Sequence, residues 1–170
     1  MWMLMYKRLA LPISYSQKKR SKKDVEAIVI HYTGNNYDDA EGNVNFFSKN
    51  NARQAGAHFF VDQEGNIGRS IPINRVAWAV GGDYREKGKG GQYYGIYTNH
   101  NTVSIELCDC KNKDASPEQI KAVKKLVKYI RRWCPNAKAI IRHYDVNGKI
   151  CPARLIDESK WRWFKKQIGG

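Results

Sequence analysis

The sequence predicts a single α/β domain in which a central mixed β-sheet is flanked by helices. Three observations support this fold class. Residues 25–32 are apolar and β-branched on both faces, as in a central strand, and residues 102–108 alternate between apolar and polar side chains. Residues 117–133 carry apolar side chains at helical spacing. With 170 residues, 42% of them hydrophobic, the chain can bury the core of one domain.

The first 23 residues differ in composition from the rest of the chain. They contain Pro12, several serines and a basic run over residues 18–23. We therefore expect an irregular N-terminal arm over residues 1–23, which leads into or wraps a domain over residues 24–170.

Turn and capping residues place the elements in the first half of the domain. Asp38 or Asp39 is expected to cap a helix over residues 40–50. Strands at 57–61 and 67–71 flank a turn that contains glycine, which predicts a hairpin.

The second half contains one long loop and four regular elements. Residues 79–101 are rich in glycine and tyrosine, and the tyrosines either stack on a ligand or pack over the sheet. A capping box at Ser116 begins the helix that ends before Pro135. A further strand at 138–143 and a final helix at 157–168 complete the domain, after the strand at 102–108.

The net charge is +14, from 30 basic and 16 acidic residues, and this suits a polyanionic partner. Anionic cell-wall polymers fit this charge. Nucleic acid would fit it too, but the usual nucleic-acid-binding motifs are absent, so no nucleic acid is expected. No apolar run is long enough for a membrane span. Lys7 and Arg8 interrupt the apolar start before a signal-peptide core forms, which indicates synthesis in the cytoplasm. We expect a monomer.

Three side chains have the chemistry of a catalytic metal site. His31 and His143 each stand at the end of a predicted strand, before a polar turn, and Cys151 follows His143 by eight residues. Two imidazoles and one thiolate leave Zn²⁺ an open position for water. Taken singly, each histidine is more often structural and a lone cysteine is more often a buried thiol, as we expect for Cys108, Cys110 and Cys134.

Four short motifs occur in a characteristic order: Ile28–Thr33, Ala57–Phe59, Asn101–Glu106 and Arg142–Pro152. Together they resemble the type 2 N-acetylmuramoyl-L-alanine amidases, a family that includes phage endolysins, bacterial autolysins and animal peptidoglycan recognition proteins. The resemblance covers about Val25 to Arg154. It implies the α/β fold of that family, with a zinc site in a surface cleft.

The resemblance assigns roles to individual residues. It implies zinc ligation by His31, His143 and Cys151, and catalytic roles for Glu106 and Lys149. Some relatives use a tyrosine just before His58 instead of the glutamate, but alanine stands there in this chain. Substrate contacts are expected at the residues matching the cleft: Tyr32, His58 and Trp78. For His58, orientation of a ligand and a purely structural role remain alternatives. The histidine that usually follows the Trp78 position is absent.

The resemblance therefore implies hydrolysis of the amide between N-acetylmuramic acid and L-alanine of peptidoglycan, by a phage or prophage endolysin acting on the wall after lysis or a non-classical exit. In this mechanism zinc lowers the pKa of bound water to about 7 and Glu106 transfers the proton. Two alternatives belong to other classes: a peptidoglycan-binding module without activity, and a basic nucleic-acid-binding protein.

Overall fold

The computed structural model describes residues 5–84 and 90–170; the start of the predicted arm (1–4) and part of the predicted long loop (85–89) lie outside the described residues. The α-helices are α1 (Ala40–Lys49), α2 (Pro117–Trp133), α3 (His143–Asn147) and α4 (Glu158–Ile168). The strands are β1 (Met5–Lys7), β2 (Tyr15–Lys19), β3 (Ala27–Tyr32), β4 (Phe59–Val61), β5 (Ile67–Arg69), β6 (Arg75–Ala77), β7 (Thr102–Leu107) and β8 (Ala139–Arg142).

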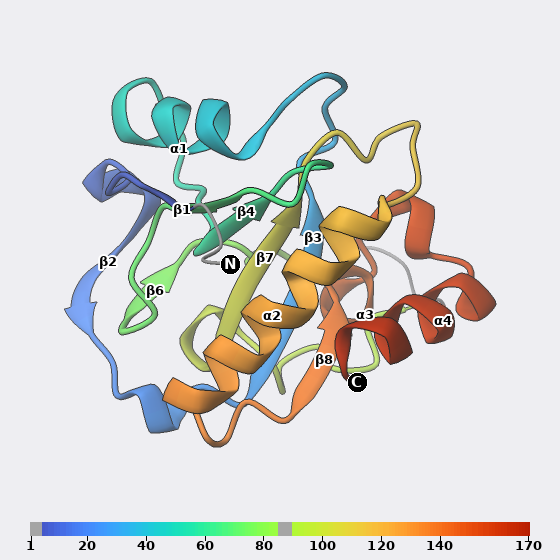
Figure 1. Cartoon of the computed structure of the whole chain (residues 1–170). Helices are drawn as coiled ribbons and strands as arrows, with labels where there is room; N and C mark the ends of the chain where they lie inside the picture. The colour runs from blue at the N-terminus through green and yellow to red at the C-terminus, as the bar shows by residue number, and fades with distance from the viewer. Residues whose placement is uncertain (1–4, 85–89) are drawn as a thin grey trace.

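Six of these strands form one mixed sheet in the order β1-β5-β4-β7-β3-β8. The strands β4, β7, β3 and β8 run parallel, and β5 is antiparallel to β4. The other two strands, β2 and β6, make a small antiparallel ribbon. The predicted fold class is therefore confirmed, and the 25–32 run supplies the central strand β3, paired on both sides (Figure 1).

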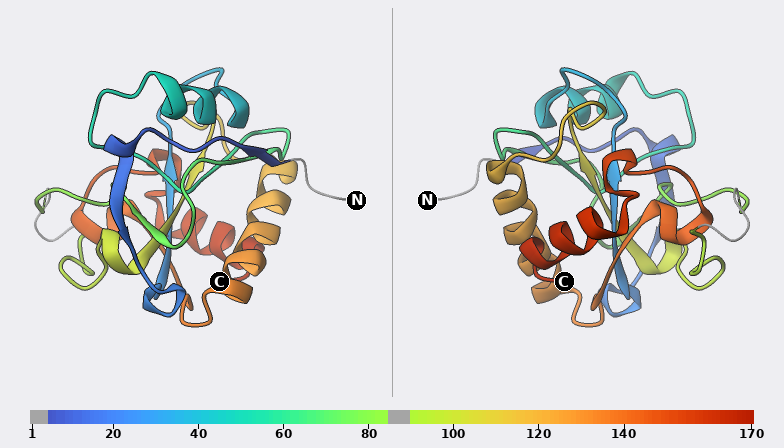
Figure 2. Two further views of the ribbon diagram at one scale, coloured as in Figure 1. Left: turned by 90° about the vertical axis from the view of Figure 1, so that its left-hand side faces the viewer. Right: turned by 90° about the vertical axis from the view of Figure 1, so that its right-hand side faces the viewer.

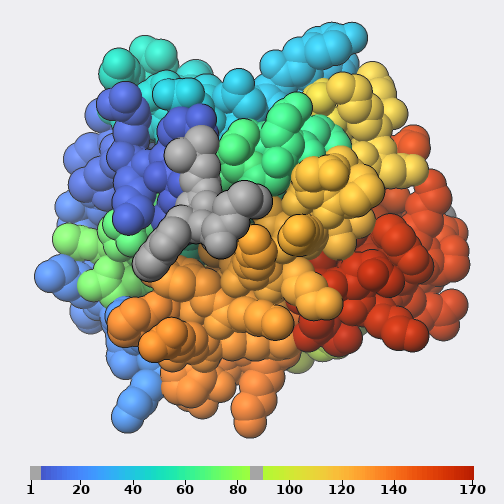
Figure 3. All heavy atoms as spheres, viewed as in Figure 1, coloured from blue at the N-terminus to red at the C-terminus, as the bar shows by residue number. Residues whose placement is uncertain are grey.

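Helices α2 and α4 cover one face of the sheet, side by side (Figures 1 and 3). Ser116 caps α2 by accepting a hydrogen bond from the Gln119 backbone, as predicted, but its own N–H donates to the Gln63 side chain and not to Gln119, so only half of the predicted capping box forms. The main core lies between these helices and the sheet: Ile28 and Ile30 of β3 pack there, with Leu126 of α2 and Phe164 of α4 among their neighbours.

The opposite face of the sheet is covered by shorter elements. Figure 2 shows α3 and the segment after residue 90 on that side, away from α2 and α4. Ala27 and Val29 pack there with Val80, Ile141 and Val146. Tyr93 and Tyr97, from the predicted long loop, pack against this cluster, whereas Tyr94 is half exposed. Packing over the sheet, one of the two predicted roles for the tyrosines, thus holds for this pair.

The N-terminal arm is more regular than the sequence predicts. β1 pairs in parallel with β5 at the edge of the sheet, and β2 pairs with β6. Strands this short have no clear alternation, and their partners lie far along the chain, so local sequence does not reveal them. Within the described residues, no helix has the length and apolar character needed to cross a membrane.

Candidate active site

The parallel pair β3 and β7 places two polar side chains next to each other. Their register pairs His31 with Glu106. Because side chains alternate along a strand, His31 lies on the face of Val29, opposite Ile28 and Ile30, which face α2. Nδ1 of His31 is 4.0 Å from Oε1 of Glu106.

His143 is held by the start of α3. The strand expected over 138–143 ends at Arg142, and His143 is the first residue of the helix. The Asp145 carboxylate accepts a hydrogen bond from the Arg142 backbone N–H at 2.8 Å, which caps α3. The same carboxylate accepts one from Nη2 of Arg142 at 2.6 Å. Both side chains are almost fully buried, so this pair fixes the orientation of the turn that carries His143.

Arg142 also binds the segment that follows Cys151. Its guanidinium donates to the carbonyl oxygens of Leu155 and Ile156 at 2.9 and 3.2 Å, and to the carboxylate of Glu158 at 2.6 Å. One buried arginine therefore connects β8, α3 and the chain leading into α4.

Cys151 returns to the sheet after α3. Helix α3 is followed by Gly148, whose φ of 80° lies in the left-handed region that favours glycine. The Tyr144 backbone N–H then donates to the Cys151 carbonyl oxygen at 3.0 Å. Sγ of Cys151 lies 3.8 Å from Nδ1 of His31.

His31, His143 and Cys151 thus form one buried cluster. Each offers a ligand atom, and these atoms all lie within 4.8 Å of one another. The two imidazole rings are 4.7 Å apart between centroids, at 64°. Nε2 of His31 and Oε2 of Glu106 are buried without a hydrogen-bond partner among the described residues. Imidazole and thiolate are donors that transition metals prefer, so the three side chains fit a metal ion.

Burial sets the protonation of the ligand candidates. It lowers the pKa of His31 well below 6.5, and the nearby His143 and Lys149 lower it further. A low pKa keeps the imidazole neutral, which is the form that binds metals. Burial, and then the Glu106 carboxylate, raise the pKa of the Cys151 thiol to about 12. A cation at the cluster would oppose this rise by stabilising the thiolate.

Burial also sets the protonation of Glu106. Burial raises its pKa to about 8, the Lys149 ammonium opposes this rise, and the Asp38 carboxylate adds to it. A carboxylate with this pKa is a stronger base than an ordinary glutamate and exchanges its proton near neutral pH.

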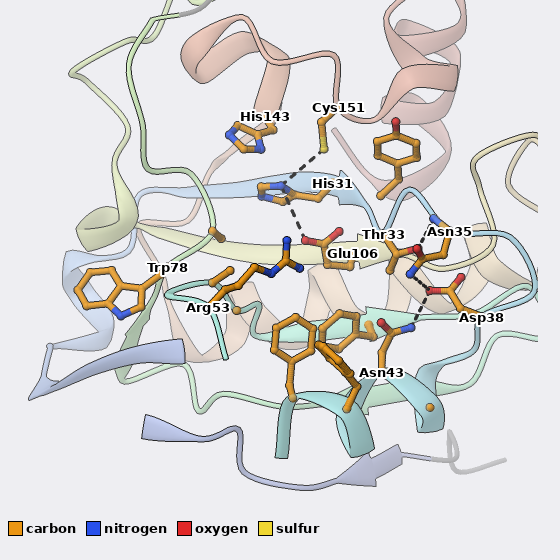
Figure 4. Close-up of a pocket in the computed structure, with 18 of the residues that line it drawn as sticks. His31, Thr33, Asn35, Asp38, Asn43, Arg53, Trp78, Glu106, His143 and Cys151 are labelled. Carbon is orange, nitrogen blue, oxygen red and sulfur yellow. Dashed lines mark hydrogen bonds and ion pairs between the residues drawn. The ribbon is translucent and has the colours of Figure 1, made fainter. Parts of the chain in front are cut away.

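The cluster opens into a cavity of about 740 Å³ between the sheet, α1 and the loop after α1 (Figure 4). Tyr32, Trp78 and Lys149, three of the predicted site residues, line this cavity together with the ligand candidates and Glu106. It is further lined by residues that the sequence analysis did not single out for the site, among them Asn35, Asp38, Asn43, Phe46, Phe47 and Arg53.

His58 does not line the cavity. It is 1% exposed, and its Nδ1 accepts a hydrogen bond from the Ser104 backbone N–H at 3.1 Å. Nε2 lies 3.1 Å from both the Arg20 guanidinium and the Arg75 carbonyl oxygen. This position favours the structural alternative over a substrate contact.

Several of the additional lining residues lie on a helix and a loop whose sequences carry no pattern that indicates a functional site. Asn43 and Phe47 fit the pattern of an amphipathic helix, and Arg53 stands in a polar turn. They line the cavity because α1 packs over β1, β4 and β5, and no local signal in the sequence reports that placement.

Comparison with known proteins adds a family assignment. The family model described as N-acetylmuramoyl-L-alanine amidase matches residues 21–154. The N-acetylmuramoyl-L-alanine amidase CwlA of Bacillus subtilis is 32% identical over 167 residues, which cover 95% of this chain. They cover 56% of CwlA, so the chain spans little more than half of that relative.

Solved structures show the same fold. The structure of PlyL superposes with a TM-score of 0.74 at 25% identity, over 99% of this chain and 98% of PlyL. A mutant endolysin from Bacillus subtilis superposes with a TM-score of 0.73 at 23% identity, over 99% of this chain and all of the endolysin chain. At this identity the similarity shows the fold alone.

Proposed function

This chain belongs to the N-acetylmuramoyl-L-alanine amidase family, and on that premise we propose that it hydrolyses the amide between the lactyl group of N-acetylmuramic acid and L-alanine in peptidoglycan. The observation that carries this proposal is the meeting of His31, His143 and Cys151 beside Glu106 in one open cavity. That arrangement combines a metal-binding cluster with a basic carboxylate.

The proposed cofactor is zinc, held by His31, His143 and Cys151. When bound, zinc supplies Lewis-acid activation of a water molecule and of the scissile carbonyl. The buried Arg142–Asp145 pair keeps His143 and Cys151 in position, because it joins the segments that carry them.

Glu106 takes the proton from the attacking water and passes it to the leaving nitrogen. Its raised pKa suits both steps, because the group must accept and release a proton near neutral pH. Lys149 places a positive charge at the cavity and stabilises the negative oxygen of the tetrahedral intermediate. Tyr32 and Trp78 contact the substrate along the cavity wall.

The test is digestion of purified peptidoglycan by the native protein, the chelator-stripped protein and the stripped protein after zinc is returned. Mass spectrometry is expected to find intact glycan strands and free peptides that begin with L-alanine, released only with metal. A protein that binds the wall and releases no peptide would be a binding module, and the amidase proposal would fall.

We place this activity in a phage or prophage endolysin, made in the cytoplasm and brought to the wall at lysis. Anionic wall polymers are its proposed second partner. The outer surfaces of α2 and α4 carry a group of exposed basic side chains, here called the basic patch: Lys121, Lys124, Lys125, Lys128, Arg132, Lys160, Arg162 and Lys166. Only Glu118 and Glu158 oppose these charges on the two helices.

Sedimentation with cell walls tests this second partner. Retention on walls that retain their anionic polymers should fall as salt rises, because salt screens exposed charges. The double variant Lys124→Gln/Lys128→Gln should lose retention, whereas Lys18→Gln/Lys19→Gln, on β2, removes the same charge and should lose less. Equal losses in the two variants would point to net charge rather than to the patch.

A further inference from the structure

We propose that the Asp38 carboxylate binds the side-chain ammonium of the third stem-peptide residue at one end of the catalytic cavity, with the side-chain oxygen of Asn43 as a second acceptor. This inference rests on the proposed function, since it names the part of the substrate that this end of the cavity selects.

Asp38 carries a negative charge that lacks a cationic partner among the residues that the structure describes. It is half-buried and lines the catalytic cavity. Its hydrogen-bond donors are neutral. The Asp109 backbone N–H donates to Oδ1, and the side-chain amides of Asn43 and Asn35 donate to Oδ2 at 2.8 and 3.4 Å. Neutral donors position a carboxylate without cancelling its charge, so this group favours a cationic ligand.

The lysine on the adjoining segment is engaged elsewhere. Nζ of Lys113 lies 2.6 Å from Oδ2 of Asp109 and 5.5 Å from the centroid of the Tyr37 ring. The other carboxylate oxygen of Asp109 accepts a hydrogen bond from the Tyr37 backbone N–H at 2.7 Å. The Asp109 carboxylate thus pairs with this cation, and the charge of Asp38 stays open to a ligand.

Asn43 adds an oxygen acceptor whose orientation is fixed. The side chain is 9% exposed, and Figure 4 shows it extending from α1 into the cavity beside Asp38. Its Nδ2 donates to the Asp38 carboxylate and to the Asp39 carbonyl oxygen, each at 2.8 Å. Turning the amide around would set its oxygen against these two acceptors. Oδ1 therefore faces the cavity, and among the described residues no donor reaches it.

The position of this pair suits the distal part of the stem peptide. In Figure 4, Asp38 and Asn43 lie on the side of the cavity away from Trp78, beyond Glu106. The charge of Asp38 still reaches the catalytic centre, because it raises the pKa of Glu106. The third residue stands two residues beyond the scissile amide, so its side chain needs a partner in the same cavity but apart from the catalytic groups.

The two acceptors match an alkylammonium ion. Such an ion offers three N–H donors and no acceptor, and its charge compensates a carboxylate. Lysine and diaminopimelate, the alternatives at the third position, both supply one. Acylation of this amine in a peptide cross-link removes the charge. The pair of Asp38 and Asn43 therefore selects stem peptides that are not cross-linked through the third residue.

Four synthetic stem tripeptides test the site and separate the two sources of the amine. One pair carries lysine or norleucine at the third residue, and the other carries diaminopimelate or α-aminopimelate, so the members of each pair differ only in the side-chain amine. Titration calorimetry with the zinc-loaded chain gives a Kd for each peptide. The proteins are the parent, Asp38→Asn, Asp38→Glu and the control Glu41→Gln, which removes an exposed carboxylate of α1 outside the catalytic cavity.

The parent is expected to bind the amine-bearing member of at least one pair about 10- to 100-fold more tightly, the effect of one hydrogen bond to a charged group. The pair that shows this preference identifies the source of the amine. Asp38→Asn should lose the preference while binding the amine-free peptide as the parent does. Asp38→Glu should retain part of the preference, and Glu41→Gln all of it.

A parent without preference in either pair, or an Asp38→Asn variant that keeps the preference, would overturn the inference. Equal loss of affinity for both members of a pair would also overturn it, because that result is expected of a purely structural residue. Binding is measured without turnover, so the outcome is independent of the peptidoglycan digestion. A parent that prefers the amine but releases no peptide from peptidoglycan would support this site and overturn the amidase function.

Discussion

His31 and Glu106 are register partners on adjacent parallel strands, with Nδ1 of one 4.0 Å from Oε1 of the other. The sheet itself thus sets the separation between a metal-ligand candidate and the base candidate. Strands position side chains more rigidly than loops do, which suits groups that must act together on one water molecule.

Replacing the base should separate catalysis from metal binding. We expect Glu106→Gln to lower kcat by about 100- to 10,000-fold, because the amide cannot take the proton from water. Zinc content, measured by atomic absorption, should stay at the parent level. Glu64→Gln, exposed and outside the catalytic cavity, is the matched control and should keep full activity. Loss of zinc together with activity in Glu106→Gln would show a ligand role instead.

Removing the thiolate should remove the metal. Cys151→Ser is expected to weaken zinc binding more than about 100-fold, since even loss of a residue that only orients a ligand costs 10- to 100-fold. Competition with a chromophoric chelator measures this affinity. Cys134→Ser, also at a fully buried thiol but outside the cluster, should keep the parent affinity. Equal affinity in both variants would exclude Cys151 as a ligand.

Metal removal should also lower thermal stability. A ligand that binds only the folded chain stabilises it, by about 2.7 kcal/mol at a free concentration 100 times Kd. The Tm measured by calorimetry is therefore expected to fall with chelator and to recover with zinc. A Tm that does not respond to chelator would mean that the cluster of His31, His143 and Cys151 holds no metal in solution.

The Arg142–Asp145 pair should be essential for stability. Arg142→Gln is expected to cost about 3–5 kcal/mol, because it leaves the Asp145 carboxylate buried without its partner. Urea unfolding measures the loss. Arg154→Gln breaks an exposed pair with Asp114 and should cost at most about 1 kcal/mol. Similar losses of stability in the two variants would show that the buried Arg142–Asp145 pair contributes no more than an exposed ion pair.

His58 should make the folded state sensitive to acid. Burial, and then the Arg20 guanidinium, lower the pKa of His58 to about 3, whereas the unfolded chain has a value of about 6.5. Between these values the unfolded chain binds a proton that the folded chain does not. The free energy of unfolding therefore falls as pH drops from 6.5 toward 3, by about 1.4 kcal/mol per pH unit from this group.

Unfolding by urea at pH 4.5, 5.5 and 6.5 tests the histidine contribution. His58→Gln should show a shallower dependence on pH than the parent, whatever its absolute stability. His100→Gln, at an exposed histidine, should keep the parent slope. A His58→Gln variant with the parent slope would assign the acid sensitivity to other groups.

The sequence predicted the elements with strong local patterns and the residues they carry. The apolar run around Ile28 and the capped helix after Ser116 have their own periodicity, and the metal-ligand candidates stand at the ends of such elements. The residues that the sequence analysis placed wrongly or did not single out owe their positions to contacts between segments far apart in the chain. His58 contacts Arg20, 38 residues away, and the turn that carries Arg53, which lines the cavity, is joined to Ser14 through Asn51. Local sequence carries no signal for such pairings.

The buried Arg142 bridge ties the site to the last segment of the chain, since its partners include Glu158 at the start of α4. During synthesis the strands that carry His31 and Glu106 leave the ribosome well before Cys151 and Glu158. Chains grow at about 5–20 residues per second, so a nascent polypeptide spends seconds with His31 and Glu106 and without the two later members of the cluster, His143 and Cys151. Premature termination before Cys151 would therefore yield a fragment that cannot assemble the full ligand cluster, so the proposed amidase activity would require chains translated past that residue.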